Sequence, residues 1–311
     1  MKHRKFGNTG KTVSEIGFGA WQLGNGYDWE GMKDDEAITL VREALDKGVN
    51  FFDTAPGYGR GKSEELLGRA LAGKRSEAVI NTKFGHWADG KTDYSANRIR
   101  ESVEQSLKRL NTDYLDSILL HNPPFDDLDG KHGHFEALEA LRQEGKIISY
   151  GASVDSSKEM LELIEKTNVG TIETMFNVFY QETATAFKRA AERNIALIVK
   201  IPLDSGWLSG KYNAESTFEG VRKRWSPDVI RKRGELVERI KFVTDAETTM
   251  TMAALRFILA YPEVSTVIPG VRNTAQLIEN AAAGDRPMPE EHVRKLQELW
   301  DNEIKHLNLG W

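Results

Sequence analysis

Hydrophobic and polar positions along this chain form a regular order of amphipathic stretches and short apolar runs. The first clear pair is an amphipathic segment over Asp34–Lys47, followed by the apolar run Val49–Asp53. Apolar residues at helical spacing predict a helix, and a run of about 4–8 apolar residues predicts a buried strand. Gly48 stands between the two, where a helix commonly ends. The pattern therefore predicts a helix–strand unit.

The same unit repeats through most of the chain. Further helices are predicted over Ser63–Ala72, Asn97–Arg109, Phe135–Glu144, Ser156–Lys166 and Ala184–Arg193. Further strands are predicted over Glu15–Gly19, Ala78–Thr82, Ser117–Leu120, Ile147–Gly151, Thr171–Phe176, Ala196–Ile201 and Thr266–Ile268. Together with Val49–Asp53 these make eight short strands. Strands that alternate with helices run parallel and are joined by right-handed crossovers.

Two architectures fit parallel strands with helices between them. An open doubly wound sheet normally carries a Gly-rich phosphate turn after its first strand, but Gln22 stands where the third glycine belongs. A closed (β/α)₈ TIM barrel needs about 250 residues plus insertions, which suits the 311 residues here. Since no linker divides the chain, we expect one barrel domain over 1–311. The irregular stretch Asp204–Asp228 is a long loop, and loops of this length in compact domains are usually functional.

Composition narrows the function classes. The chain is 40% hydrophobic and carries a net charge of −5 with both signs interspersed, which argues against nucleic-acid or membrane-surface binding. It contains no cysteine, which excludes disulfides, thiolate metal sites and cysteine nucleophiles. No apolar run is long enough to span a bilayer, and the first residues lack the apolar region of a secretory signal. We therefore expect a cytoplasmic protein.

Three further motifs receive ordinary structural interpretations. Gly61-Lys62-Ser63 resembles the end of a phosphate-binding loop, but the glycine required five positions earlier is Pro56. His132 and His134 have no partner cluster in the sequence, so we expect a solvated loop and no metal site. The basic runs Arg222-Lys223-Arg224 and Arg231-Lys232-Arg233 are interpreted as a solvated helix face in this acidic chain.

Polar side chains follow three neighbouring apolar runs at the point where each strand ends. Asp53, Lys83 and His121 end their strands, and Tyr58 lies in the turn after the second strand. Each alone is typical of a structural role, as a helix cap, a lysine reaching water or a hydrogen-bonded histidine. Active sites of (β/α)₈ barrels lie at the carboxyl ends of the strands. Together, the four residues therefore predict an active site.

The chemistry of these four groups favours proton transfer to an oxygen atom. A tyrosine has an ordinary pKa near 10, and a neighbouring ammonium group lowers that pKa. A carboxylate fixes the ammonium in place, and a histidine can hydrogen-bond an oxygen on which negative charge develops. We therefore expect Lys83, held by Asp53, to lower the pKa of Tyr58.

The sequence resembles the aldo-keto reductases over almost its whole length, in order and at the family's spacing. The matching segments are Gly17-Phe18-Gly19-Ala20-Trp21, Asn50–Ala55, Tyr58-Gly59, Ser63-Glu64, Thr82-Lys83, Asp113–Asp116, Leu119-Leu120-His121, Gly151-Ala152-Ser153, Pro202-Leu203, Gly206–Lys211 and Ile268–Arg272 with Gln276, Glu279 and Asn280.

The resemblance implies a (β/α)₈ barrel that binds NADPH, with NADH less favoured, and reduces aldehydes or ketones to alcohols. Tyr58 would be the general acid, supported by Lys83 and Asp53, and His121 would orient the carbonyl group. The substrate would be a small carbonyl compound, with Trp21, His86 and Trp87 as pocket walls beside Tyr58 and His121. The resemblance sets neither an oligomeric state nor the substrate.

The resemblance also implies a set of cofactor-binding residues. Arg272 would meet the adenosine 2′-phosphate, because a guanidinium group suits phosphate geometry. The full set is Gly19, Trp21, Ser153, Lys200, Pro202, Leu203, Gly206, Leu208, Gly210, Lys211, Ile268, Gly270, Arg272, Gln276, Glu279 and Asn280.

The chain departs from the family pattern around the expected nicotinamide position. Val154 replaces the usual Asn, Glu173 replaces a frequent Gln, and Lys200 replaces an aromatic residue. Glu173 and Lys200 end adjacent predicted strands, so we expect them to pair across the rim of the barrel. The alternative function is an NADPH-binding regulatory or redox-sensing subunit on the same fold, with little turnover.

Overall fold

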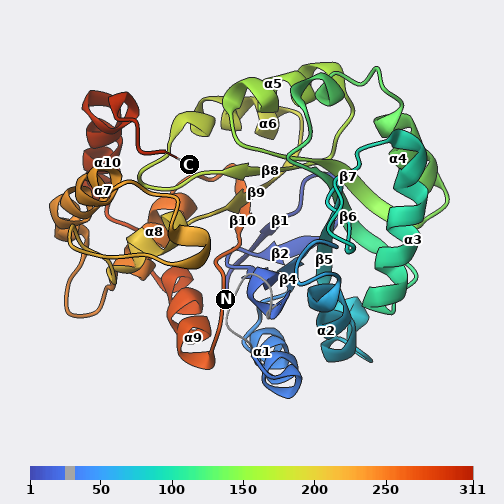
Figure 1. Ribbon diagram of the computed structural model, residues 1–311, viewed down its shortest axis with the longest axis horizontal. Helices are drawn as coiled ribbons and strands as arrows, with labels where there is room; N and C mark the ends of the chain where they lie inside the picture. Colours follow the sequence, from blue (N-terminus) through green and yellow to red (C-terminus); the bar gives the residue numbers. More distant parts are fainter. Residues whose placement is uncertain (25–31, 311) are drawn as a thin grey trace.

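The computed structural model describes residues 1–24 and 32–310, and its centre is one sheet of eight parallel strands (Figure 1). The order across the sheet is β10-β9-β8-β7-β6-β5-β4-β3. The strands are β3 (Phe18–Gly19), β4 (Phe51–Asp53), β5 (Val79–Phe84), β6 (Leu115–His121), β7 (Ile147–Val154), β8 (Thr171–Met175), β9 (Ala196–Lys200) and β10 (Val264–Val267).

The first and last strands of this sheet are joined by backbone hydrogen bonds. Gly17 N donates to Val267 O at 2.8 Å, and Val267 N donates to Glu15 O at 3.0 Å. A parallel bridge also links Gly19 to Gly270. The sheet therefore closes on itself, which confirms the predicted (β/α)₈ barrel and excludes the open doubly wound sheet.

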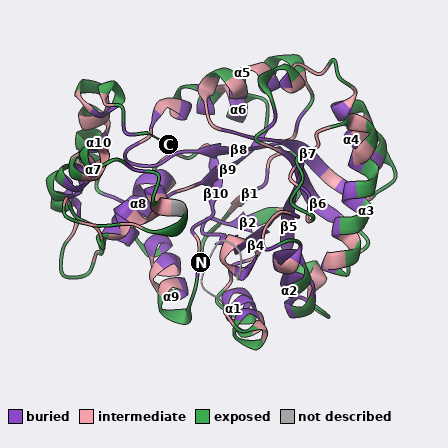
Figure 2. Ribbon diagram, viewed as in Figure 1, coloured by how far each residue is buried: buried purple, intermediate pink, exposed green. Residues whose placement is uncertain are grey.

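Helices surround the barrel, and their buried faces point toward the strands (Figure 2). The helices that follow the strands are α1 (Asp34–Asp46), α2 (Lys62–Ala70), α3 (Ile99–Leu110), α4 (His134–Gln143), α5 (Ser157–Lys166), α6 (Phe187–Glu192), α8 (Met250–Leu259) and α9 (Thr274–Ala282). Two additional helices, α7 (Pro227–Arg239) and α10 (Glu290–Asn302), lie together on one side of the barrel (Figure 1). In the part of the chain that the structure describes, no helix has the length and apolar character needed to cross a membrane.

A short antiparallel hairpin closes one end of the barrel, and the hydrophobic pattern did not predict it. Its strands are β1 (His3–Lys5) and β2 (Thr12–Ser14). They are only three residues long and β1 is wholly basic, so they lack the alternation that marks a strand. Phe6 and Val13 from this hairpin join the apolar cluster that contains Phe51, Val79 and Leu119.

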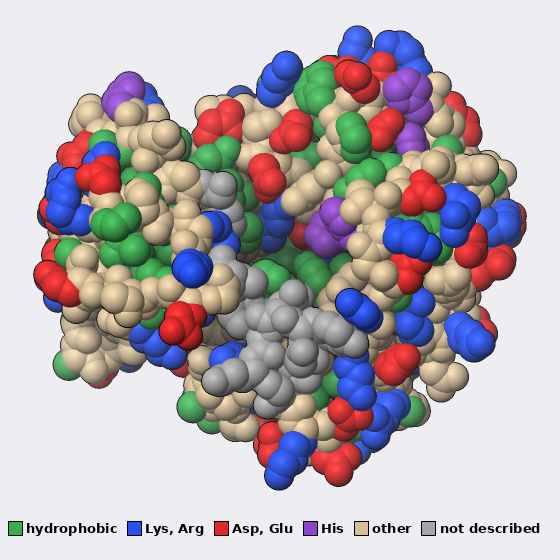
Figure 3. Space-filling view, in the orientation of Figure 1, with side chains coloured by type: hydrophobic (Ala, Val, Ile, Leu, Met, Phe, Trp, Pro, Cys, Tyr) green, Lys and Arg blue, Asp and Glu red, His purple; other side chains and the backbone are tan. Residues whose placement is uncertain are grey.

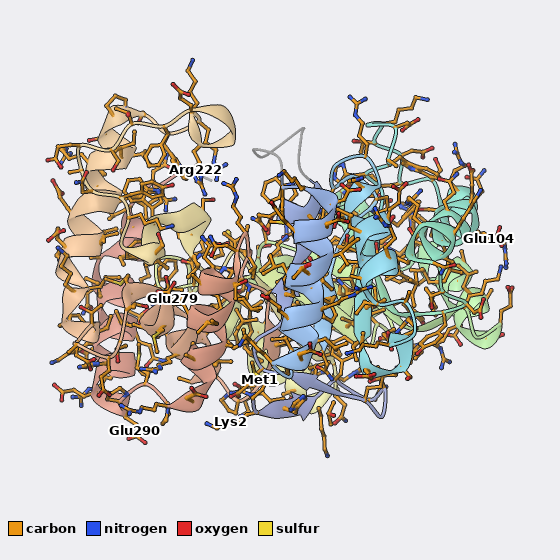
Figure 4. The ribbon with its side chains drawn as sticks, turned by 90° about the horizontal axis from the view of Figure 1, so that it is seen from below. Met1, Lys2, Glu104, Arg222, Glu279 and Glu290 are labelled. Atoms are coloured by element: carbon orange, nitrogen blue, oxygen red, sulfur yellow. The ribbon has the colours of Figure 1, made fainter. Side chains whose placement is uncertain are left out.

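Two-residue alternation along the strands explains where the polar side chains of the barrel lie. Phe51 and Val79 are paired across β4 and β5 and belong to the same apolar cluster. Two residues further along, Asp53 is paired with Asn81, and Lys83 follows on the same face. Since alternate residues of a strand share a face, these polar groups point into the barrel above its apolar layer. Figure 4 shows Met1 and Lys2 at the hairpin end, with Arg222 at the opposite end.

Arg4 attaches the hairpin to the end of helix α8 and to β10. Its guanidinium group donates to the carbonyl oxygens of Leu259, Tyr261 and Val264 at 2.7, 3.0 and 2.8 Å. It also donates to Glu15 Oε2 at 2.9 Å. An arginine that binds the last carbonyls of a helix satisfies groups that have no partner within the helix.

We predict that Arg4→Ala lowers the free energy of unfolding by about 2–4 kcal/mol, because it removes several charge-assisted hydrogen bonds from a partly buried position. Urea unfolding followed by circular dichroism measures this difference. Lys5→Ala, at an exposed position of the same strand, is the matched control and is expected to change the free energy by less than about 0.5 kcal/mol. Equal effects of the two substitutions would contradict the anchoring role of Arg4.

Candidate active site

A buried ion pair between Asp53 and Lys83 forms the floor of the candidate site. Lys83 Nζ lies 2.5 Å from Asp53 Oδ1 and 3.1 Å from Thr54 O, and the Lys83 side chain is completely buried. Asn81 Nδ2 donates to the same Asp53 oxygen at 2.7 Å. The carboxylate is thus held from two sides, and the predicted pairing of Asp53 with Lys83 is present.

A second carboxylate, that of Glu173, also faces Lys83. Glu173 Oε2 lies 3.3 Å from Lys83 Nζ, and both side chains are buried. Burial and the charge of Glu173 raise the pKa of Asp53 to about 7. Burial lowers the pKa of Lys83, but the charges of Asp53 and Glu173 outweigh this effect and raise it above the usual value. Lys83 is therefore a charged ammonium group between two acidic side chains.

Tyr58 lies beside this ion cluster, in the loop between β4 and α2. Lys83 Nζ is 5.4 Å from the centroid of the Tyr58 ring. The loop turns sharply at Gly59, which has a positive φ of 56°. A Cβ atom at Gly59 would collide with the backbone of Gly24, so only glycine allows this close approach. The turn directs Tyr58 to the carboxyl ends of the strands.

The net effect of its surroundings is to raise the pKa of Tyr58 above the usual value. Desolvation raises this pKa, Lys83 lowers it, and the carboxylates of Asp53 and Glu173 raise it. The sequence-based expectation that Lys83 lowers the pKa of Tyr58 is confirmed for this pair of groups. Desolvation and the carboxylates of Asp53 and Glu173 outweigh that effect, so the pKa is raised overall. Tyr58 is therefore a protonated hydroxyl group.

His121 ends β6 and faces Tyr58 edge-on, with the ring centroids 5.9 Å apart. Burial, together with the charge of Lys83 and the proximity of His86 and Lys200, holds the pKa of His121 well below its usual value. Its imidazole is therefore neutral. The Nδ1 atom is buried and has no hydrogen-bond partner among the described residues. The orientation of β6 at this point is fixed by Tyr94, whose hydroxyl group donates to His121 O.

The predicted pocket residues differ in where they lie. The Trp21 ring is 5.9 Å from that of Tyr58, and the His86 ring is 4.9 Å from that of His121, so both border the site. Trp87 instead joins the hydrophobic core, and its Nε1 donates to Asp93 O. Figure 3 shows this face of the molecule hollowed over the middle of the barrel, with apolar side chains in the hollow and charged and histidine side chains at its edge.

Lys200 does not pair with Glu173, contrary to the sequence-based expectation. Its Nζ contacts Asn122 Oδ1 at 2.7 Å, Ser153 Oγ at 2.8 Å and Asp155 Oδ1 at 2.9 Å. Ser153 in turn donates to Glu173 Oε1 at 2.9 Å. The hydroxyl group of Ser153 thus separates the two charges, and Glu173 turns instead to Lys83 inside the barrel. Neither Asn122 nor Asp155 was predicted, although Asn122 directly follows His121 and Asp155 directly follows Val154, both of which the sequence analysis had named.

The loop after β9 carries many of the predicted cofactor-binding residues and has a strained backbone. Asp204, Ser205 and Gly206 all have positive φ values, of 47°, 55° and 103°. Side chains from further along the chain hold this conformation, because Arg222 Nε donates to Ser205 O at 2.8 Å and Arg233 forms a buried ion pair with Asp204. Within this loop, Pro202 and Leu208 are buried, Leu203 is half-buried, and Gly210 and Lys211 are exposed.

Arg233 corrects the interpretation of the second basic run as a solvated helix face. It is almost completely buried, and its guanidinium group also donates to the carbonyl oxygens of Leu309 and Gly310 at 3.3 Å. The neighbouring Arg231 is exposed and pairs with Asp228 and Glu235, as expected of a solvated face. Helical rotation separates the two arginines, and a run of like charges conceals that difference.

The remaining predicted cofactor residues lie where β10 leads into α9. Ile268 is buried in the barrel, and Gly270 packs against Gln22 so closely that a Cβ atom would collide with its side chain. Arg272 is exposed and directly precedes Asn273, whose side chain caps α9. Gln276 Oε1 accepts from Arg272 N at 2.9 Å. Glu279 and the buried Asn280 follow on the same helix (Figure 4).

Comparison with known proteins assigns the family. The model of the Aldo/keto reductase family matches residues 15–301. The chain belongs to the aldo/keto reductase family. It is 31% identical to an uncharacterized oxidoreductase, YqkF, of Bacillus subtilis, over 96% of each protein. It also superposes on the solved holo form of the aldo-keto reductase AKR11C1 from Bacillus halodurans, with a TM-score of 0.82, 29% identity and 96% of each chain covered.

Two further relatives have different functions. A probable voltage-gated potassium channel subunit beta of Arabidopsis thaliana is 31% identical over 92% of each protein. An NADH-specific methylglyoxal reductase of Escherichia coli is 28% identical, over 91% of this chain and 93% of that protein. Aldo/keto reductases are oxidoreductases that use nicotinamide cofactors.

The residues of this aldo/keto reductase fit such a cofactor. The buried Nδ1 of His121 and Nδ2 of Asn280 have no hydrogen-bond partner among the described residues. Arg272 and the capped start of α9 suit a phosphate group, because backbone N–H groups at a helix start attract anions. Across residues 1–24 and 32–310, no group of three or more acidic or histidine side chains could hold a metal ion.

We predict that the stability of the protein depends on pH through Asp53. Folding raises the pKa of this carboxyl group from 3.8 to about 7, so between these values the folded state binds the proton more tightly than the unfolded state. The contribution of Asp53 to stability is therefore greatest below about pH 4 and declines as the pH rises toward 7.

Urea unfolding of the wild type and of Asp53→Asn at several pH values measures this dependence. The wild type is expected to lose about 2 kcal/mol or more relative to the variant between pH 4 and pH 7.5. A difference between the two proteins that is constant over this range would contradict the raised pKa of Asp53.

Proposed function

We propose that this protein reduces aldehyde or ketone carbonyl groups to alcohols with NADPH. The observation that carries the proposal is the Tyr58 hydroxyl group, held protonated beside the Lys83 ammonium and facing the neutral imidazole of His121. A protonated donor and a neutral hydrogen-bonding ring on one side of a hollow suit an oxygen that gains negative charge and then a proton.

Each of the four predicted residues then has a defined role. The carbonyl oxygen of the substrate lies between Tyr58 and His121, and His121 orients it. Tyr58 donates its proton to this oxygen, which leaves a phenolate that the Lys83 ammonium stabilises. Asp53 holds Lys83 in place through the 2.5 Å ion pair. When bound, the nicotinamide supplies the hydride to the carbonyl carbon.

The surroundings of the site indicate which residues would hold the cofactor. Ser153 and Lys200, the centre of a buried polar network, would contact the nicotinamide carboxamide. The remaining members of the predicted set, in the loop after β9 and the segment from Ile268 to Asn280, would contact the rest of the molecule. Arg272 favours NADPH over NADH because it would pair with the 2′-phosphate. The NADH-specific relative shows that cofactor choice varies among similar proteins.

A regulatory role is the second candidate. The similarity to a probable potassium channel subunit beta favours it, and such a subunit would bind NADPH with little turnover. The side chains of Tyr58, Lys83 and His121 lie close together, with Asp53 paired to Lys83, and this arrangement favours the enzyme. Loss of NADPH absorbance with a panel of aldehydes and ketones separates the two functions, since tight NADPH binding without turnover of any substrate would support the regulatory role.

The expectations of one domain over 1–311 and of a cytoplasmic location stay predictions.

We predict that Tyr58→Phe lowers kcat for carbonyl reduction by about 10²–10⁴-fold, because it removes the proton donor. The dissociation constant for NADPH, measured by quenching of tryptophan fluorescence, is expected to stay within about threefold of the wild type. Near-normal turnover in this variant would show that another group donates the proton.

We predict that Arg272→Ala weakens NADPH binding by about 10–100-fold and leaves NADH binding nearly unchanged, because only NADPH carries the 2′-phosphate. Fluorescence titration with both cofactors measures this. Arg286→Ala is the matched control, since Arg286 is an exposed arginine that pairs with Glu247. An equal loss for both cofactors would contradict the assignment of Arg272.

A further inference from the structure

The proposed mechanism uses one counter-ion for Lys83, but the structure provides two. Asp53 Oδ1 is 2.5 Å from the ammonium nitrogen and Glu173 Oε2 is 3.3 Å from it. The two carboxylates come from β4 and β8, which are not neighbours in the sheet, and therefore approach Lys83 from different directions. Glu173 is 2% exposed, so it has no alternative partner in solvent.

The position of Glu173 is fixed independently of Lys83. Glu173 is paired in register with Ser153 of β7, and the Ser153 hydroxyl group donates to Glu173 Oε1 at 2.9 Å. On its other side Ser153 accepts a hydrogen bond from Lys200 Nζ at 2.8 Å. Asp155 then pairs with Lys200 from the more exposed side. Glu173 thus has one oxygen on the serine and one directed at Lys83.

The negative and positive charges of the groups around Glu173 are unequal in number. When ionised, Asp53, Glu173 and Asp155 supply three negative charges, and Lys83 and Lys200 supply two positive ones. His121 and the neighbouring His86 lie on the same side of the barrel; burial lowers the pKa of both, and His121 is neutral. Glu173 is therefore a second acidic side chain directed at the ammonium group of Lys83, in addition to Asp53.

We propose that Glu173 is a positioning residue that acts through Lys83: by keeping this ammonium group compensated, it keeps the Tyr58 hydroxyl protonated and sets the site for proton donation. An uncompensated ammonium beside a tyrosine favours the phenolate, which accepts protons and suits alcohol oxidation. With two carboxylates on the ammonium, the protonated hydroxyl is favoured, which suits carbonyl reduction. The inference rests on the proposed function only where it says that the site suits carbonyl reduction rather than alcohol oxidation.

The test is a titration of Tyr58 in the cofactor-free protein, which does not depend on activity. Tyrosine is labelled with ¹³C at Cζ, and the Tyr58 resonance is identified by its absence from Tyr58→Phe. In the wild type we expect Tyr58 to stay protonated at pH values beyond the ordinary tyrosine value. In Glu173→Gln, which keeps the shape of the side chain, we expect at least about tenfold more phenolate at a given pH. Glu173→Asp, which keeps the charge, is expected to restore part of the wild-type behaviour.

Two further variants make the assignment specific. Asp155→Asn removes the same charge from Lys200 rather than from Lys83, and it is expected to leave the Tyr58 titration unchanged. Asp53→Asn leaves Glu173 on Lys83, so Tyr58 is expected to stay protonated there to a higher pH than in the double variant Asp53→Asn, Glu173→Gln. If Glu173→Gln does not fold, Glu173→Asp replaces it in the titration: its carboxylate is drawn back from Lys83 by one methylene group, so more Tyr58 phenolate than in the wild type is expected at a given pH.

Three results would overturn the inference. These are an unchanged Tyr58 titration in Glu173→Gln, a shift in Asp155→Asn as large as that in Glu173→Gln, and equal titrations of Asp53→Asn and the double variant. Failure of the proposed function has a different signature, since it is the absence of carbonyl reduction by the wild type. Where the wild type is active, the pH above which carbonyl reduction declines is expected to be lower in Glu173→Gln, because Tyr58 loses its proton at lower pH.

Discussion

The structure depends on how a buried ammonium group is kept charged inside a barrel. An unpaired charge in a protein interior is strongly unfavourable, and it becomes acceptable only when ion pairs and hydrogen bonds replace its hydration. Lys83 obtains these from Asp53, Glu173 and the carbonyl oxygen of Thr54. Three strands must therefore bring polar groups to one level of the barrel, directly above the apolar layer. Tyr58 and His121 lie beside these groups, and burial together with the nearby charges sets the protonation of both.

Two parts of the molecule outside the sheet, the hairpin and the loop after β9, support this arrangement and the surrounding site. The hairpin closes the opposite end of the barrel, where Phe6 and Val13 pack beneath the apolar layer and Arg4 ties the hairpin to α8. The loop after β9 is strained, and the buried pair of Arg233 and Asp204 connects it to the carbonyl oxygens near the end of the chain. Backbone strain of this kind persists where the surroundings enforce it, and it commonly accompanies a functional site.

The sequence predicts the barrel and the ends of its strands well, because the alternation of apolar and amphipathic segments carries that information. It also brings Asp53, Lys83 and His121 to one rim, since the rim follows from strand ends alone. It does not predict that Glu173 meets Lys83, because contacts across the interior depend on the barrel's closure and on which oxygen Ser153 engages. Nor does it separate Arg233 from Arg231, whose burial depends on helical rotation against a loop far away in the sequence. The pKa of Tyr58 depends on burial and on every neighbouring charge, and from the sequence only the effect of Lys83 was predicted.

In the proposed reaction, Tyr58 and His121 together hold the carbonyl oxygen, and Tyr58 protonates it. The measurement that tests it most directly is a crystal structure of the protein with NADP⁺ and an unreactive carbonyl ligand. We expect the ligand oxygen to lie within hydrogen-bond distance, about 2.6–3.2 Å, of both the Tyr58 hydroxyl group and the His121 imidazole. A ligand bound in the hollow with its oxygen directed away from Tyr58 would contradict it.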